Sequence, residues 1–217
     1  MTHAFEHTIT DVSQLRELYR EPGGAAVSKE ADGLDDACRG FIAQSTFVLV
    51  GTSDADGKLD VSPRGGSPGF VKVLDSRRLA IPDLNGNNRL DSIRNIVEHG
   101  QVGLLFVVPG LGETLRINGT AAITTDPAIL DLFADEFRRP TTAIGVEFEQ
   151  GFLHCAKAFR RSGLWQPDTW PEISGRPSAG QMLVDHAGLG NQMTAEQVTE
   201  MLEESYRVDL AADQPEG

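Results

Sequence analysis

The sequence predicts a mainly β protein with helical additions (α+β), built around a small antiparallel barrel of six or seven strands. Three observations support this fold class. Short runs with strand composition follow one another in hairpin order between residues 46 and 149. Turn-forming pairs such as Asp56-Gly57 and Asn85-Gly86 separate the runs. A helix crosses between two of the strands, whereas a parallel α/β sheet would require regular alternation of strands and helices.

Composition limits the class of protein. Of the 217 residues, 40% are hydrophobic and 24% are charged, which is typical of a globular chain with one substantial core. There is no run of eighteen apolar residues, and the first residues lack a basic and apolar signal region. We therefore expect a cytoplasmic protein that does not bind membranes. The two cysteines, Cys38 and Cys155, lie far apart, so we expect reduced thiols and no metal site.

The charge of the chain is unevenly distributed. A net charge of −13 argues against a nucleic-acid surface and against binding to an anionic membrane. Between Val61 and Gly100, however, there are six basic and four acidic residues. An acidic chain with a basic middle indicates a confined site for a small anion.

We expect three parts along the chain. Residues 1–45 form helices that pack on the barrel, one capped by Thr10 or Asp11 and a second over residues 34–43. Residues 46–165 form the barrel. Residues 166–217 form a connector and a final helix that starts at Thr194, with Gln197 completing a capping box.

Seven runs are expected to form the strands. Residues 63–69 contain three glycines and two prolines, and we expect a loop whose backbone approaches another group closely. Gly119 interrupts the longest run and predicts a bend or bulge. Asp126 and Pro127 begin a helix that continues to about Phe137. The expected strands are residues 46–52, 59–62, 70–74, 78–81, 102–108, 113–124 and 142–149.

The most informative stretch is residues 81–97. Its second half predicts a helix, with an N-cap at Asn87 or Asn88 and a stop at His99-Gly100. The apolar positions at helical spacing are Leu90, Ile93, Ile96 and Val97. A helix start offers unpaired N–H groups and the positive end of the helix dipole, and Arg89 adds a guanidinium suited to a phosphate. The alternative is an ordinary capped helix with a surface arginine.

Several motifs in a fixed order resemble the pyridoxamine phosphate oxidase-like flavoproteins. They are Asp60-Val-Ser-Pro-Arg-Gly-Gly-Ser-Pro-Gly-Phe-Val, then Ile81-Pro-Asp with Gly86-Asn-Asn-Arg-Leu-Asp-Ser-Ile-Arg-Asn-Ile, then Val102-Gly-Leu-Leu-Phe and Glu113-Thr-Leu-Arg-Ile-Asn-Gly. The resemblance covers about residues 41–165. It implies an FMN-binding split β-barrel that forms a homodimer, with FMN in a groove between the subunits.

The same resemblance implies roles for individual residues. Ser62, Pro63 and Arg64 would line the flavin, while Pro82 and Asp83 would meet the edge of its isoalloxazine ring. Asn88 and Arg89 would hold the phosphate. Glu113 and Thr114 would reach the cofactor from the partner subunit.

The run Phe152-Leu-His-Cys-Ala-Lys-Ala resembles a C-terminal motif of one branch of that superfamily. His154 and Lys157 would lie on opposite faces of a strand, or on one face of a helix. Either side chain could stand beside the flavin, where a cation stabilises the anionic reduced ring. The alternative is a structural segment with a buried Cys155 and a hydrogen-bonded histidine.

Together these features predict an FMN-dependent oxidoreductase that acts on a small organic molecule, with NAD(P)H as a candidate electron donor. No catalytic residue is identified; Asp83 and His154 are candidates by position alone. The chain lacks the C-terminal tryptophan–arginine pattern that pyridoxamine phosphate oxidases use on their substrate, which argues against vitamin B6 oxidation. The alternatives are a flavin-binding carrier or sensor without turnover, and a split barrel for haem or deazaflavin.

Overall fold

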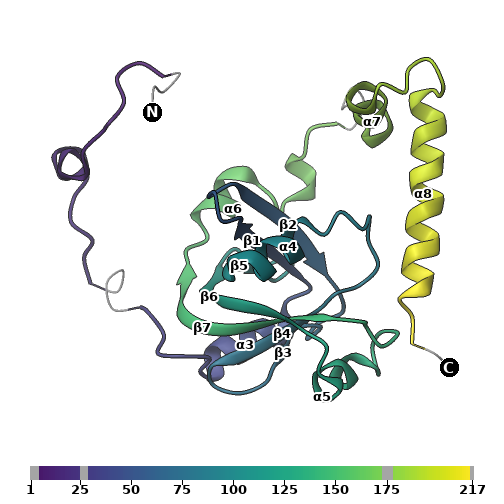
Figure 1. Ribbon diagram of the computed structural model, residues 1–217. Coiled ribbons are helices and arrows are strands. Elements are labelled where there is room, and N and C mark those ends of the chain that lie inside the picture. The colour runs from purple at the N-terminus through teal and green to yellow at the C-terminus, as the bar shows by residue number, and fades with distance from the viewer. Residues whose placement is uncertain (1–4, 25–28, 173–177, 216–217) are drawn as a thin grey trace. The chain divides into compact units, whose positions relative to one another are not determined.

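The computed structural model describes residues 5–24, 29–172 and 178–215 (Figure 1). The chain divides into two units, Met1–Glu30 and Ala31–Gly217. In the first unit, η1 (Val12–Gln14) and α1 (Leu15–Leu18) form only two short turns. Asp11 caps them, as one of the two predicted caps, by accepting a 2.8 Å hydrogen bond from the Ser13 N–H. The division into parts at residues 45 and 165 stays a prediction.

The second unit contains seven antiparallel strands in one sheet. This arrangement confirms the predicted fold class. The order across the sheet is β2-β1-β5-β6-β7-β4-β3. Because β2 and β3 are both edge strands in the described part of the chain, the barrel is split rather than closed. The strands are β1 (Phe47–Ser53), β2 (Leu59–Gly65), β3 (Lys72–Val73), β4 (Arg78–Pro82), β5 (Gln101–Val107), β6 (Thr114–Thr124) and β7 (Ala143–His154).

Helices and short turns connect or follow the strands. Asp126 caps α5 as predicted, but the helix ends at Leu130 and continues as a 3-10 turn rather than reaching Phe137. The capping box of Thr194 and Gln197 is present at the start of α8. The elements are α3 (Asp36–Gln44), α4 (Asp91–Glu98), α5 (Pro127–Leu130), η2 (Asp131–Phe133), α6 (Lys157–Ser162), η3 (Pro167–Thr169), α7 (Ala179–Ala187) and α8 (Ala195–Ala212).

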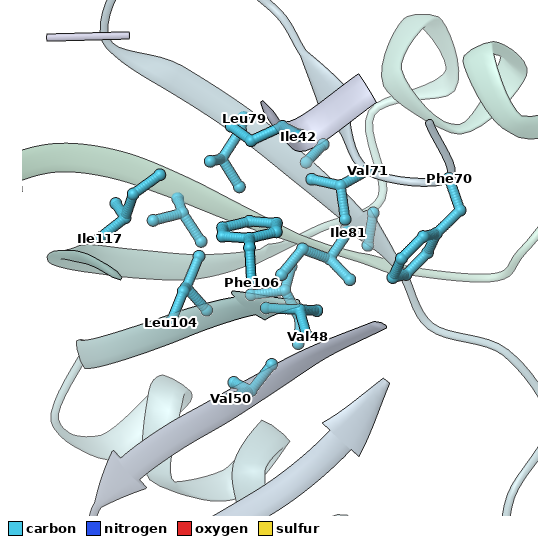
Figure 2. Close-up of a cluster of buried hydrophobic side chains, with 14 of the residues drawn as sticks. Ile42, Val48, Val50, Phe70, Val71, Leu79, Ile81, Leu104, Phe106 and Ile117 are labelled. Atoms are coloured by element: carbon cyan, nitrogen blue, oxygen red, sulfur yellow. The ribbon is translucent and has the colours of Figure 1, made fainter. Parts of the chain in front are cut away.

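One face of the sheet and α3 enclose the hydrophobic core. Alternate residues along β1 and β5, such as Val48, Leu104 and Phe106, are buried because strand side chains alternate between faces (Figure 2). From α3, Ile42 joins this cluster. Cys38 lies in the same helix, and burial, with help from Asp35, raises the pKa of its thiol to about 11. That thiol therefore stays protonated and unreactive at neutral pH.

Two strands are several residues longer than the sequence predicts, whereas the predicted strand 70–74 is reduced to β3 (Lys72–Val73). The prediction that residues 63–69 form one loop is wrong for Pro63, Arg64 and Gly65, which belong to β2. Proline is tolerated there because β2 is an edge strand with one unpaired side. The loop proper begins at Gly66, where an added Cβ would lie 2.6 Å from Cβ of Phe70. The backbone of Gly66 therefore does lie close to another group, as the sequence predicts.

The second difference is the length of β7, which runs to His154 instead of residue 149. The irregularity predicted at Gly119 is present, but the extra residue of the bulge lies in β7: Asn118 pairs with Gln150 and Gly119 with Phe148, so Glu149 is left over. A Cβ on Gly119 would collide with the carbonyl oxygen of Glu147. The bulge therefore requires glycine at this position.

Candidate functional site

A groove of about 990 Å³ brings together seven of the residues that the sequence analysis assigned to a cofactor site. Its walls are the second half of β2, the residues from Pro82 to the start of α4, and residues near the end of α8. Phe70 and Phe137 also border it, although both side chains are buried in the core. The seven predicted residues on its lining are Ser62, Pro63, Arg64, Pro82, Asp83, Asn88 and Arg89.

The helix α4 begins at this groove without a side-chain cap. The prediction that Asn87 or Asn88 is the N-cap is wrong, because the cap position is Leu90 and no side chain bonds there. The Oδ1 atom of Asn87 instead accepts a 3.1 Å hydrogen bond from the Arg89 N–H within the loop. Uncapped N–H groups at a helix start can bind an anion.

Two of the predicted inward positions of α4 also differ. Leu90 is 49% exposed and Val97 is 71% exposed, whereas Ile96 is buried. The helix is short, and Leu90 has left the helical conformation with φ of 60°. The apolar contact of α4 with the core is therefore narrower than the sequence pattern indicates.

Polar contacts fix α4 against the β1–β2 hairpin. The Ser92 hydroxyl donates to Oδ2 of Asp60 at 2.5 Å, and the Asn95 amide donates to Oγ1 of Thr52 at 3.0 Å. One turn further on, the Nδ1 atom of His99 lies 3.0 Å from the Ser53 hydroxyl. Sequence reasoning missed these contacts. The spacing of three to four residues between the three polar side chains of α4 was the available signal.

Arg89 is held by a neighbouring carboxylate. Its Nε atom donates to Oδ2 of Asp91 at 2.8 Å, and this hydrogen bond, with the charges of Asp91 and Asp60, raises the pKa of Arg89. Within the described ranges, no protein acceptor binds its two terminal nitrogens. The side chain is 73% exposed and also lines a smaller cavity of about 250 Å³, together with Lys58 and Arg94. A guanidinium oriented through Nε can still bind an anion through its free edge.

The other polar side chains of the groove are also positioned. The carboxylate of Asp83 accepts a 3.2 Å hydrogen bond from the Thr142 hydroxyl. The backbone N–H of Asp83 donates to the Thr142 carbonyl at 3.1 Å. Arg64 donates to the Pro63 carbonyl at 2.9 Å and to the Ser62 hydroxyl. Asp83 is thus held at the strand end, and Arg64 is bonded within its own strand.

Four predicted site residues do not line the groove of their own chain. Thr114 is buried and pairs with His154 across β6 and β7. Thr114 lies three strands away from Gly65 at the groove, a separation of about 14 Å along the sheet at ~4.8 Å per strand. The residues outside the groove lining are Glu113, Thr114, His154 and Lys157.

Neither predicted conformation of residues 152–157 is correct. The strand β7 ends at His154 and α6 begins at Lys157, so the two side chains share neither a strand nor a helix. The His154 ring lies 5.0 Å from the ring of Phe152. Cys155 is exposed rather than buried, which removes part of the structural alternative.

In the described part of the chain, no group of three or more His, Cys, Asp or Glu side chains could hold a metal ion. Among the helices described, none combines the length and the hydropathy that a membrane span needs.

Three solved structures illustrate what the fold is similar to. HupZ from Group A Streptococcus is 19% identical, with 55% of this chain and 92% of that chain covered and a TM-score of 0.46. A putative pyridoxamine 5'-phosphate oxidase from Lactobacillus delbrueckii is 22% identical, with 57% and 98% covered and a TM-score of 0.44. HutZ, the heme storage protein from Vibrio cholerae, is 12% identical, with 56% and 94% covered and a TM-score of 0.40.

No curated protein matches this sequence. The model of the family described as pyridoxamine 5'-phosphate oxidase, however, matches residues 34–155. This range contains all seven strands, α4 and the seven predicted residues of the groove. Since it spans more than half of the 217 residues, the chain belongs to the pyridoxamine 5'-phosphate oxidase family.

Proposed function

We propose that this protein is a cytoplasmic FMN-dependent oxidoreductase that works as a homodimer on a small organic molecule. The observation that carries the proposal is the groove, which joins an uncapped helix start, Arg89 and a strand-end carboxylate in one cavity. A volume of about 990 Å³ lies at the upper end of the range of about 300–1,000 Å³ for small-molecule sites.

The phosphate of FMN fits the α4 end of the groove. Uncapped N–H groups at the helix start and the terminal nitrogens of Arg89 are donors suited to a dianion. The bond to Asp91 restricts the Arg89 side chain before a ligand arrives, so less side-chain entropy is lost on binding. Asn88 lies beside Arg89 and would contribute its amide.

The ring of FMN fits the rest of the groove. The apolar part of the groove lining is available to a planar ring, and Pro82 with Asp83 would meet its edge. When bound, FMN would supply two-electron redox chemistry through its ring. The protein would bind and orient the cofactor, and the carboxylate of Asp83, held by Thr142, is placed to hold a proton near the ring edge.

The outer face of the sheet supports the homodimer. On β2, β1 and β5, the residues that point away from the core form rows of apolar or small side chains. Val61 is 64% exposed and Phe47 is 38% exposed. The rows are Val61, Gly51 and Gly103; Pro63, Leu49 and Leu105; and Gly65, Phe47 and Val107.

A second subunit on this face would also account for the four residues outside the groove. Thr114 and His154 continue the row that starts at Gly65, so they border the apolar face. We propose that Glu113, Thr114, His154 and Lys157 of one subunit approach the FMN bound by the other. Each cofactor site would then be incomplete in a single chain.

Arg89→Ala tests the phosphate assignment. We expect FMN to bind about 10- to 100-fold more weakly, because a charge-assisted hydrogen bond of about 1.5–3 kcal/mol is lost. The matched control is Arg78→Ala. Arg78 is also exposed and also bonds a nearby carboxylate through Nε, at 2.7 Å to Asp75, but it does not line the groove. Fluorescence titration with FMN measures both affinities.

The outcomes separate the candidate functions. A yellow purified protein whose colour bleaches with NADH or NADPH supports the oxidoreductase. A flavin that neither nicotinamide reduces, in the presence of trial substrates, indicates a carrier or sensor instead. Equal FMN affinity of Arg89→Ala and the unchanged protein refutes the site, and binding of haem or deazaflavin but not FMN refutes the cofactor.

A further inference from the structure

Within the described part of the chain, the loop between β4 and α4 makes a single hydrogen bond to a distant segment. Residues 84–90 carry Asn88 and Arg89, and the first of them, Leu84, packs against the core. Past this apolar anchor, the backbone N–H of Asn85 donates to Oδ1 of Asp213 at 3.1 Å. The other hydrogen bonds described for this loop join it to itself or to α4.

Asp213 is the C-cap of α8 and is attached at two points. Its carboxylate holds Asn85, and its carbonyl oxygen accepts a 2.7 Å hydrogen bond from the Arg138 N–H. Leu210, Asp213 and Gln214 line the groove. The end of α8 therefore forms a wall of the groove, although this helix lies outside the matched family range of residues 34–155.

Helix stability does not account for an acidic residue at this position. A negative charge at a helix C-terminus is unfavourable with the helix dipole. The same charge also lines a groove that we assign to an anion, so its long-range effect opposes ligand binding. What the side chain contributes is a hydrogen-bond acceptor for a loop that is otherwise held through its ends.

We infer that Asp213 is a positioning residue that fixes the loop carrying Asn88 and Arg89, so that the C-terminal helix controls the affinity of the groove for its anion. The identity of the anion as the FMN phosphate rests on the proposed function. The positioning itself does not, because it concerns the Asn85 N–H and can be measured without ligand.

Two substitutions separate positioning from charge. Asp213→Ala removes the acceptor and the charge, whereas Asp213→Asn removes the charge and keeps an acceptor oxygen. The control is Asp209→Ala, which removes a carboxylate one turn earlier on α8 that does not line the groove. Hydrogen exchange of residues 84–90 in the full chain without ligand, and fluorescence titration with FMN, are measured for all four proteins.

We expect Asp213→Ala to raise amide exchange in residues 84–90 and to weaken FMN binding, each about 2- to 10-fold, as for the loss of one hydrogen bond. Asp213→Asn should bind FMN at least as tightly as the unchanged protein, and Asp209→Ala should match it. Unchanged loop exchange in Asp213→Ala overturns the inference, as does equal weakening by both Asp213 variants. If the unchanged protein binds no FMN, the proposed function fails, and the exchange data still decide the role of Asp213.

Discussion

Arg89 lies between two residues with unusual backbone conformations. Asn88 has φ of 57° and Leu90 has φ of 60°, both in the left-handed region. Asparagine tolerates this conformation, but leucine does so at a cost of roughly 1–2 kcal/mol. Strained residues concentrate at functional sites, where the surrounding structure enforces them. This strain supports the proposal that the loop is shaped for a ligand rather than for stability.

A second feature at the scale of single residues is the ion pair between Lys72 and Glu136, which lies beside the loop that begins at Gly66. Lys72 donates to Glu136 and to the carbonyl of Gly69, and the Ser67 hydroxyl donates to the same glutamate at 2.7 Å. Burial acts to raise the pKa of Glu136, but the hydrogen bonds from Lys72 and Ser67 and the charge of Lys72 outweigh it, so the pKa is lowered from 4.5.

This lowered pKa predicts a pH-dependent stability. A carboxylate whose folded pKa is depressed stabilises the fold above its unfolded pKa and loses that contribution as pH falls through the folded pKa. Glu136→Gln should therefore destabilise the protein by about 1 kcal/mol at pH 7, a value reduced for partial solvent exposure. The difference should shrink as the pH falls below 4.5. Urea unfolding of both proteins across this range measures it, and a difference independent of pH would contradict the assignment.

At the scale of elements, α4 and the β1–β2 hairpin behave as one piece. The contacts from Ser92, Asn95 and His99 to this hairpin hold the helix start against β2, whose residues form the facing wall of the groove. The position of the uncapped N–H groups is therefore set by strands that come earlier in the chain. A rigid element is a more accurate support for a binding site than a loop.

The bulge in β7, opposite Gly119 of β6, gives a prediction at the same scale. Gly119→Ala should destabilise the fold by about 1–3 kcal/mol, because the new Cβ would collide with the Glu147 carbonyl and the backbone must shift. Gly40→Ala is the matched control. Gly40 lies inside α3, and the place where a Cβ would be added is open. Alanine there should stabilise the protein by about 0.5–1 kcal/mol. Denaturant unfolding measures both changes, and a neutral Gly119→Ala would mean that the bulge relaxes freely.

At the scale of the whole molecule, the apolar outer face of the sheet gives a prediction about assembly. Leu105→Glu, or Val61→Glu at the sheet edge, should weaken the proposed homodimer by about 100-fold or more, because the dimer would bury an unpaired charge. Val97→Glu is the control, since Val97 is 71% exposed but lies on α4. Light scattering after size-exclusion chromatography measures the mass. A monomeric unchanged protein, or a dimer insensitive to both face variants, would contradict the proposal.

Features that depend on neighbouring residues could be predicted from the sequence, whereas features that depend on contacts between distant segments could not. The strands and the bulge at Gly119 follow from alternation and glycine placement, which are local. The extension of β2 through Pro63 depends on that strand being at an edge, which is a property of the whole sheet.

The site shows the same division. The motifs predict one cofactor site for Arg64, Asp83 and Arg89, and the three residues line one groove, but their roles stay a prediction. The left-handed Leu90 and the bond from Asn85 to Asp213 were not predictable, since both depend on contacts between segments far apart in sequence.

The contact between Asn85 and Asp213 also has a consequence for biosynthesis. The last strand ends at His154, so a ribosome working at about 5–20 residues per second adds the roughly 60 residues up to Asp213 over several seconds. During that interval the nascent sheet can already fold while its binding surface lacks the helical side. If the groove binds FMN as proposed, the cofactor can therefore be loaded onto the emerging polypeptide before the last turn of α8 is made.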